Sequence, residues 1–401
     1  MVATERPSPS HAFGAGPSLS RNAGEGQIDA RETLLVYRHR LAPLSEVEFL
    51  RRFYIGFERL APVWLGCHID AGAGVLTSDP LRLGRTGPLG TLDRTLFRHF
   101  GLLPPQPDLR ALRPLVLHAH FGRGGALALP IARALRIPLV VTFHGADATK
   151  ETHYRRRLVP RIYARRLAAL QREAALFVCV SEFVRDRLLA RGFPPEKLAV
   201  IHQGVELDAA EAVEPAGDPY VLFVGRFVEK KGVSDLIAAM RILESRVRLV
   251  LIGDGPLSGA LRGEARGLKR VEFLGWLPNT EVRRWMRGAV ALCVPSVTGP
   301  GGDSEGLPTV IFEAMAEAVP VVGSNHAGIA EAVEHGSTGL LVPEGDPPAL
   351  ADALASLIER PELRRRLGAA ARAVAAERFS ALRQSRRLEA ALLRVAGLAP
   401  P

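Results

Sequence analysis

The chain has 401 residues, of which 47% are hydrophobic, and it carries a formal net charge of +10 at pH 7. This length accommodates two domains of ordinary size, and no apolar run approaches the roughly 18 to 20 residues of a membrane-spanning helix. Three scattered cysteines, Cys67, Cys179 and Cys293, lack metal-ligand spacing and are interpreted as buried thiols of a reducing cytoplasm.

Residues 1–30 are rich in Gly, Ser and Pro, without the hydrophobic core of a secretion signal, and are predicted to form a disordered arm. From Thr33 onward, short apolar runs alternate with helical patterns, which is typical of parallel sheets with crossover helices. Strands are predicted at 33–37, 62–66, 115–119, 138–143, 176–180 and 198–202. Helices are predicted at 46–60, 125–135, 155–173 and 181–191, with one more near 91–100.

Residues 209–219 are acidic and rich in Ala and Pro, which predicts an interdomain linker. A second alternating array follows. Its strands are predicted at 220–224, 247–252, 271–274, 290–294, 319–323 and 340–342. Its helices are predicted at 232–244, 256–266, 280–287, 308–317, 327–334, 347–359 and 361–376, with an amphipathic helix at 380–395.

The predicted fold class is therefore α/β, with two Rossmann-like domains whose parallel sheets face each other across a cleft. The N-terminal domain spans 31–208 and the C-terminal domain 220–378, and a helix within 379–401 is expected to return to the N-terminal domain. Ligands of open parallel sheets bind beyond the carboxyl ends of the strands, so the cleft between the domains is the expected site.

One stretch, Asp303 to Ala316, carries two carboxylates on either side of a predicted helix start. Pro308 suits the first helical position, which leaves Glu305 in the loop and Glu313 about 7 Å further along the axis. Between them lie the free N–H groups and positive dipole end of the helix, where a phosphate binds well. Carboxylates accept hydrogen bonds from diols, so the stretch suits a nucleotide-diphosphate sugar. Taken alone, two such glutamates are more often solvated surface residues.

A cationic turn opens the second array. Arg226 follows Gly225 at the carboxyl end of a strand, and Lys231 precedes a predicted helix, so both cations can converge on one anion. A charge-assisted hydrogen bond to phosphate contributes about 1.5–3 kcal/mol. Solvated basic residues at a turn are the ordinary alternative.

The stretch from Asp303 resembles the paired-glutamate signature of retaining family-4 glycosyltransferases of the GT-B superfamily, in the glycogen synthase/phosphorylase-like clan. The cationic turn resembles the diphosphate clamp of that family, and Thr142–Asp147 resembles its Thr-Phe-His-Gly-x-Asp segment. The resemblance covers residues 31–395 and is strongest over 220–345. It implies four catalytic residues, which are His144, Arg226, Lys231 and Glu305. It implies donor-binding roles for Gly225, Gly253, Leu277, Ser304, Gly306, Leu307, Pro308, Thr309 and Glu313.

On the acceptor side, the resemblance departs from the usual pattern. Where many relatives carry a glycine-rich loop, residues 38–46 look more like the Pro-x-Ser-Glu form of polysaccharide-assembling members. Ser45, Glu46 and Asp147 are therefore the acceptor-side candidates, although Ser45 and Glu46 equally suit a helix cap. A lone histidine at a strand end is more often structural than catalytic, and His118 and His120 are expected to support the fold or line the cleft.

The resemblance implies transfer of a hexose from a UDP- or GDP-sugar, with retention, to a hydroxyl of a glycan or lipid-linked glycan in bacterial exopolysaccharide or lipopolysaccharide biosynthesis. No cofactor or metal is expected, since the chain lacks an Asp-x-Asp motif. The protein is expected to be cytoplasmic, with contact to an anionic membrane surface as an added option.

Two alternatives stay open. One is a nucleotide-sugar epimerase on the same GT-B frame, which needs no acceptor. The other is a basic membrane- or nucleic-acid-binding protein without catalysis, suggested by the arginines between 155 and 166. A solvated helix face explains those arginines more simply. Nucleic acid is not an expected partner, because aromatic residues are few and are not interleaved with the basic ones.

Overall fold

A computed structural model describes residues 31–42, 46–70, 79–151, 162–207, 218–243 and 247–400. The predicted N-terminal arm, most of the predicted linker and the first part of the predicted helix 155–173 lie outside the described residues. None of the helices that the structure describes combines the length and apolar character needed to cross a membrane.

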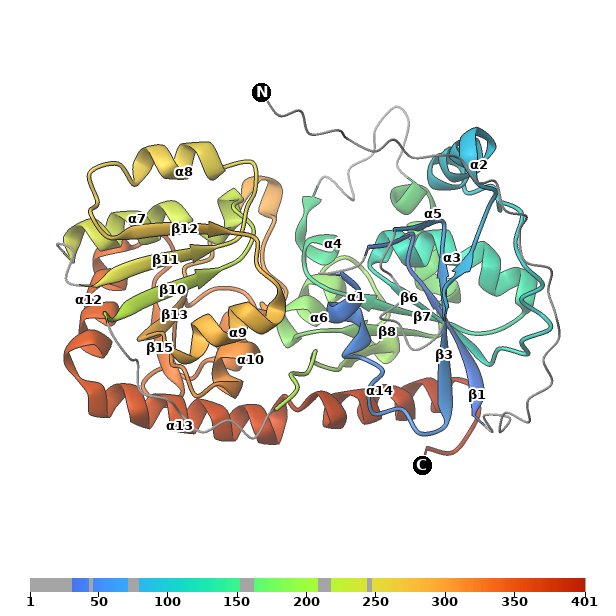
Figure 1. Ribbon diagram of the computed structural model, residues 1–401. Coiled ribbons are helices and arrows are strands. Elements are labelled where there is room, and N and C mark those ends of the chain that lie inside the picture. Colours follow the sequence, from blue (N-terminus) through green and yellow to red (C-terminus); the bar gives the residue numbers. More distant parts are fainter. Residues whose placement is uncertain are drawn as a thin grey trace, which may run out of the picture. The chain divides into compact units, whose positions relative to one another are not determined.

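The first described sheet has seven strands in the order β5-β3-β1-β6-β7-β8-β9, with every neighbouring pair parallel. Figure 1 labels β1, β3, β6, β7 and β8 of this sheet. Its central strands are continuous buried runs, as expected of a parallel sheet covered on both faces. The strands are β1 (Glu32–Tyr37), β3 (Leu60–Gly66), β5 (Leu81–Arg82), β6 (Val116–His120), β7 (Leu139–Phe143), β8 (Leu176–Cys179) and β9 (Leu198–Val200). A separate short pair joins β2 (Arg40–Leu41) to β4 (His68–Ile69).

Helices surround this sheet, and one of them packs on β6 and β7. That helix, α3, is rich in Gly and Ala on its buried side, which lets it approach the strands closely. The helices are α1 (Glu46–Arg51), α2 (Gly87–Phe100), α3 (Gly122–Leu135), α4 (Ala146–Thr149), α5 (Ile162–Glu173) and α6 (Glu182–Leu189), with a 3-10 turn η3 (Pro195–Lys197).

The second sheet is also parallel and has the order β12-β11-β10-β13-β14-β15 within the described part of the chain. Its strands are β10 (Tyr220–Val224), β11 (Arg248–Ile252), β12 (Val271–Gly275), β13 (Ala291–Val294), β14 (Val321–Ser324) and β15 (Gly339–Val342). Its helices are α7 (Val233–Ile242), α8 (Ser258–Glu264), α9 (Asn279–Arg287), α10 (Thr309–Ala316), α11 (Ile329–Ala332), α12 (Pro347–Glu359) and α13 (Pro361–Arg378). Two 3-10 turns are η4 (Glu229–Lys231) and η5 (Pro300–Gly302).

The last helix, α14 (Ala381–Val395), contacts the residues ahead of β3 in the first sheet. The buried carboxylate of Glu389 accepts hydrogen bonds from the backbone N–H groups of Glu58 (3.0 Å), Arg59 (2.8 Å) and Leu60 (2.8 Å). The N–H of Gly56 donates to Ser385 Oγ at 3.0 Å. Between α13 and α14, Ser380 forms an isolated parallel bridge with Val205.

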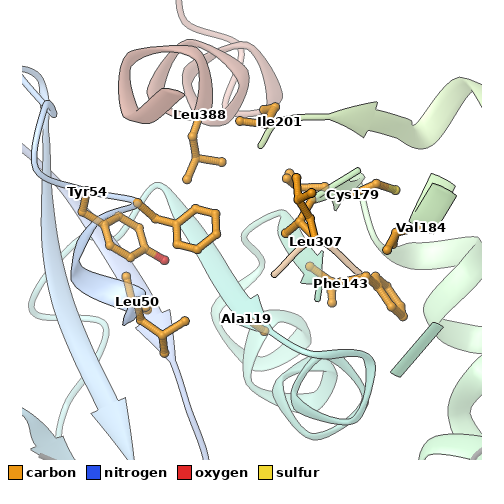
Figure 2. Packing of buried hydrophobic residues seen from close by; sticks show 14 of the residues in the cluster. Leu50, Tyr54, Ala119, Phe143, Cys179, Val184, Ile201, Leu307 and Leu388 are labelled. Atoms are coloured by element: carbon orange, nitrogen blue, oxygen red, sulfur yellow. The ribbon is translucent and has the colours of Figure 1, made fainter. Parts of the chain in front are cut away.

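Buried apolar side chains form a large cluster that includes residues of both sheets. Leu307, from the loop ahead of α10, and Leu388, from α14, belong to the same cluster as Tyr54 and Phe143 (Figure 2). A second cluster occupies the other side of the second sheet, beneath α7 and α12. The loop that carries Glu305 is therefore anchored by its own apolar residue, Leu307.

The predicted α/β class with two parallel sheets is confirmed, but several helix limits were wrong. The helix predicted at 46–60 ends at Arg51, because turns follow and Gly56 packs against α14, where a Cβ would lie 2.4 Å from Ser385 Oγ. Pro308 is the extended cap residue of α10 rather than its first helical residue. The helices predicted at 256–266 and 327–334 are shorter, as α8 and α11.

Candidate functional site

Glu305 lies between two lysines in the loop that connects β13 to α10. Lys231 Nζ is 3.1 Å and Lys230 Nζ 3.6 Å from Glu305 Oε1. The residue is only 8% exposed. Burial alone would raise the pKa of Glu305, but the charges of Lys231 and Lys230 outweigh it and hold that pKa below its usual value. Glu305 is therefore an ionised carboxylate at neutral pH.

The same loop is bound to the first half of the chain by several polar contacts. Asp303 pairs with Lys230 at 3.1 Å and with Lys150, just after α4, at 3.2 Å. The Ser304 N–H donates to Thr149 Oγ1 at 3.1 Å. The carbonyl of Gly306 accepts from the Ser181 hydroxyl at 3.0 Å. These contacts hold the loop that carries Glu305 against the residues that follow β7 and β8.

His144 and Gly306 come into backbone contact, which joins the two segments that the sequence singled out. A Cβ on Gly306 would lie 2.1 Å from the carbonyl oxygen of His144, and one on Gly145 would lie 2.5 Å from the Gly306 nitrogen. Gly145 also has φ of 136°, a conformation that other residues rarely adopt. Glycine is thus required on both sides of this contact.

The turn after His144 is held by Asp147. Its carboxylate accepts from the backbone N–H groups of His144 (3.0 Å), Gly145 (2.9 Å) and Gly122 (3.0 Å). Burial raises the pKa of Asp147, and these donors offset the effect only in part. The structure thus gives Asp147 a place in shaping the turn, and its contact with an acceptor stays a prediction. Ser45 lies outside the described residues, and of Glu46 only the backbone is described.

Arg226 and Lys231 are both near the loop, but they share no partner among the residues that the structure describes. Arg226 is exposed, whereas Lys231 is paired with Glu305. A cavity of about 410 Å³ lies beside the loop. It is lined by residues in and just after α4 and by residues of the second half of the chain, several of them charged. Among its lining residues are Lys150, Arg226, Glu229, Lys230 and Asp303. No motif in the sequence indicated Lys150. Of the adjacent Lys230 and Lys231, the sequence favoured Lys231, and the structure places both near Glu305.

Glu313 is buried rather than solvated, at 7% exposure. Its Oε1 accepts from Arg52 Nη1 at 2.7 Å and from Asn279 Nδ2 at 3.2 Å. Asn279 begins α9, two residues after the partly buried Leu277. Arg52 belongs to no motif, so nothing in the sequence pointed to it.

The remaining donor-site candidates lie at the turns around these charges. Gly253 has φ of 138°, and a Cβ there would lie 1.9 Å from the carbonyl oxygen of Gly225. Close packing of the backbone therefore explains why position 253 is a glycine, independently of any donor-binding role. Ser304 is buried and its hydroxyl donates to the Gly302 carbonyl at 3.3 Å. Thr309 begins α10, whose first turn has no side-chain cap. The amino end of α10 therefore follows the Glu305 loop directly, as predicted.

Two family models match the chain. Residues 77–209 match the model described as Glycosyltransferase Family 4, and residues 205–374 match the one described as Glycosyl transferases group 1. Together they cover both candidate segments, the one around His144 and the one around Glu305.

Curated relatives match over part of their length. The putative colanic acid biosynthesis glycosyltransferase WcaL of Salmonella typhimurium is 37% identical over 60% of this chain and 60% of its own length. The amylovoran biosynthesis glycosyltransferase AmsK of Erwinia amylovora is 35% identical over 59% and 60%. The phosphatidyl-myo-inositol mannosyltransferase of Mycobacterium leprae is 34% identical over 64% and 67%. The matches to the first two thus span about three fifths of those proteins.

Solved structures extend the likeness to nearly the whole chain. Anabaena Alr3699/HepE, in complex with UDP and glucose, matches with a TM-score of 0.74 and 20% identity over 91% of this chain and 100% of its own. Sucrose-phosphate synthase from Thermosynechococcus elongatus matches with a TM-score of 0.74 and 20% identity over 92% and 100%. At this level of identity the likeness concerns the fold, and it confirms the predicted GT-B arrangement.

Proposed function

The chain belongs to family 4 of the glycosyltransferases, and we propose that it transfers a hexose from a nucleotide-diphosphate sugar to a hydroxyl of a glycan or lipid-linked glycan, with retention of configuration. The observation that carries the proposal is the buried Glu305 carboxylate, paired with Lys231 at the approach to α10 and in a loop that touches the backbone of His144. Bacterial exopolysaccharide assembly is the proposed setting, because two relatives are named for colanic acid and amylovoran biosynthesis. A UDP- or GDP-hexose is the proposed donor.

The ion pairs of the structure suggest how the donor enters. A diphosphate carries more negative charge than one carboxylate, so it competes for Lys231, Lys230 and the exposed Arg226. Once Lys231 turns to the diphosphate, the carboxylate of Glu305 becomes an acceptor for hydroxyls of the sugar. At the nucleotide end, Glu313 would accept from the ribose hydroxyls in place of Arg52.

Charge stabilisation is then the main source of rate. When the bond between sugar and diphosphate breaks, negative charge grows on the leaving phosphate, where the lysines, Arg226 and the amino end of α10 provide fixed positive potential. The acceptor hydroxyl attacks from the face that the diphosphate leaves, and a phosphate oxygen of the donor takes the hydroxyl proton. This path needs no protein nucleophile. We also propose that it needs no metal ion, since these cations supply the charge.

The test is a set of variants assayed for transfer from a panel of UDP- and GDP-hexoses. We expect Arg226→Ala and Lys231→Ala each to lower turnover by about 10²-fold or more in folded protein. Lys269→Ala removes an exposed lysine of the same half and serves as the control. Full turnover in folded Lys231→Ala protein would contradict the proposed charge stabilisation. Dialysis against EDTA should leave wild-type turnover unchanged.

The two glutamates are expected to differ. Glu305→Ala should abolish transfer, whereas Glu313→Ala should chiefly weaken nucleotide binding, measured by calorimetry. If both variants lose binding and turnover alike, the proposed division between sugar end and nucleotide end is wrong. Conversion of the donor to an epimer without any glycosylated acceptor would instead support an epimerase.

Membrane contact is a separate proposal, because an acceptor built on a lipid carrier lies at a membrane surface. The described part of the basic helix, α5, presents Arg165 to solvent, while Arg166 donates to the carbonyls of Ala126 and Gly101. Flotation with anionic liposomes, compared with neutral liposomes, tests this contact. Equal flotation with both would argue against an electrostatic role for the helix.

A further inference from the structure

Tyr54 places its hydroxyl between two buried histidines of β6. It follows α1, is 4% exposed and belongs to the core cluster drawn in Figure 2. Its hydroxyl oxygen is 2.7 Å from His118 Nδ1 and 2.7 Å from His120 Nε2. The two histidines are two residues apart on one strand, so their side chains lie on the same face of the sheet.

The contacts continue from both histidines to the neighbouring strand β7 and the residue after it. His118 Nε2 is 2.7 Å from Thr142 Oγ1, and His120 Nδ1 is 3.1 Å from His144 Nε2. Five side chains therefore form one unbranched line of hydrogen bonds, which runs from Thr142 to His144 through Tyr54. We call this line the histidine relay.

Counting protons shows that the relay behaves as a unit. Burial lowers the pKa of His118 to about 3 and puts those of His120 and His144 well below their usual value, so all three rings are neutral. A neutral imidazole has one N–H and a phenol has one O–H. Tyr54 can therefore donate to one histidine only and must accept from the other.

That choice fixes every other link. If Tyr54 donates to His118, His120 donates to Tyr54 through Nε2 and must accept from His144 Nε2–H, which leaves His144 Nδ1 as an acceptor. If Tyr54 donates to His120, the order reverses and His144 Nδ1 carries the proton. The direction in which the Tyr54 hydroxyl donates is thus coupled to the tautomer of His144.

His144 Nδ1 is the end of the relay that is available to bind a ligand. It is buried and has no hydrogen-bond partner among the described residues. The imidazole ring of His144 packs against the ring of Phe121, with 4.3 Å between centroids, and against that of Phe49, with 5.3 Å between centroids. A buried polar atom without a partner is costly, so a ligand group that satisfies it gains affinity.

We propose that Tyr54 is a positioning residue, whose hydroxyl acts through His120 to hold His144 in a single tautomer and ring orientation, with Nδ1 ready for a hydroxyl of the transferred sugar. The second part rests on the proposed function, since it needs a sugar at this place. The first part is a property of the protein alone. Tyr54 itself need not touch the substrate.

The experiment compares Tyr54→Phe with Tyr37→Phe, which removes the hydroxyl of another fully buried tyrosine of the same half. Tyr37 contacts His39 at 3.3 Å and lies outside the relay. Selective ¹⁵N labelling of histidine gives the tautomer of each ring from its nitrogen shifts, with His144→Asn used to assign the His144 signals. We expect one neutral tautomer of His144 in wild-type and Tyr37→Phe protein, and a mixture in Tyr54→Phe.

The kinetic readout separates positioning from a structural role. We expect Tyr54→Phe to lower kcat for sugar transfer about tenfold with KM for the donor changed less than about threefold, while Tyr37→Phe keeps wild-type values. Should Tyr54→Phe fail to fold, His120→Phe interrupts the relay at the next link and should give the same changes. An unchanged His144 spectrum in the folded variant, or an equal loss of kcat in Tyr37→Phe, overturns the proposal.

Failure of the proposed function would look different. In that case wild-type protein would transfer no hexose from any donor, and the proposal that His144 binds a hydroxyl of the transferred sugar would be wrong as well. The nitrogen shifts of Tyr54→Phe would still decide whether the relay fixes the His144 tautomer.

Discussion

Replacing Glu389 by alanine should destabilise the first half of the chain by about 3 to 5 kcal/mol. The buried carboxylate accepts from the N–H groups of Glu58, Arg59 and Leu60, and the variant leaves all three without that partner. An unsatisfied buried donor costs about 1–3 kcal/mol. The Leu60 N–H is buried and takes the upper end of this range, whereas the other two are partly exposed and recover hydrogen bonds to water.

The assay is urea unfolding followed by tryptophan fluorescence, since buried Trp64 lies in β3, close to the affected residues. Arg386→Ala is the matched control on the same helix. It removes an ion pair to Glu58 in which both side chains are 55% exposed, so its cost should stay below about 1 kcal/mol. Hydrogen exchange of the Leu60 amide should accelerate only in the Glu389 variant. If Glu389→Ala costs no more than Arg386→Ala, the carboxylate does not stabilise this turn as reasoned.

Three further outcomes follow from burial and charge. Gly306→Ala should remove most transfer activity while the protein stays folded, because the new methyl group meets the His144 carbonyl; wild-type turnover would contradict this contact. Burial raises the pKa of all three cysteine thiols, so a thiol reagent at pH 8 should label them only after unfolding, and rapid labelling of native protein would be contrary evidence. Because Lys231 holds the pKa of Glu305 below 4.5, the stability that Glu305 contributes is present above that pH and is lost as the pH falls through the lower folded value. Urea unfolding at several pH values should therefore show that the difference in free energy of unfolding between wild-type and Glu305→Gln protein changes below pH 4.5. A difference that stays constant with pH would refute this coupling.

The strands were predictable because a parallel sheet is buried on both faces. Runs such as Leu139–Phe143 need only be apolar, and their position between helical patterns identifies them. Helix limits were harder, since apolar residues continue past Arg51 as Phe53 and Tyr54 without helical structure. Those rings are buried by contacts with distant segments, including α14, which local periodicity cannot anticipate.

The site divides in the same way. Glu305, Lys231 and His144 stand in motifs of characteristic order, so the sequence singled them out and the structure brings their segments together. Arg52 reaches Glu313 from a distant part of the chain and has no pattern around it. The spacing of His118 and His120, two residues apart, does indicate that both side chains lie on one face of the strand. No pattern in the sequence around Tyr54 predicts that its hydroxyl lies between them.

The bridge between Val205 and Ser380 bears on how the two halves move. The chain passes from one half to the other just after Val205 and returns just before Ala381, and these residues are joined by hydrogen bonds from Val205 N to Phe379 O (2.8 Å) and from Ala381 N to Val205 O (2.9 Å). Gly204 is pressed so close that a Cβ would lie 2.2 Å from the Ala381 Cα. The two crossings are therefore hydrogen-bonded to each other at one place, which restrains sliding of one half along the other. Rotation about this place is less restrained, so we expect the two halves to open and close by a hinge motion about it.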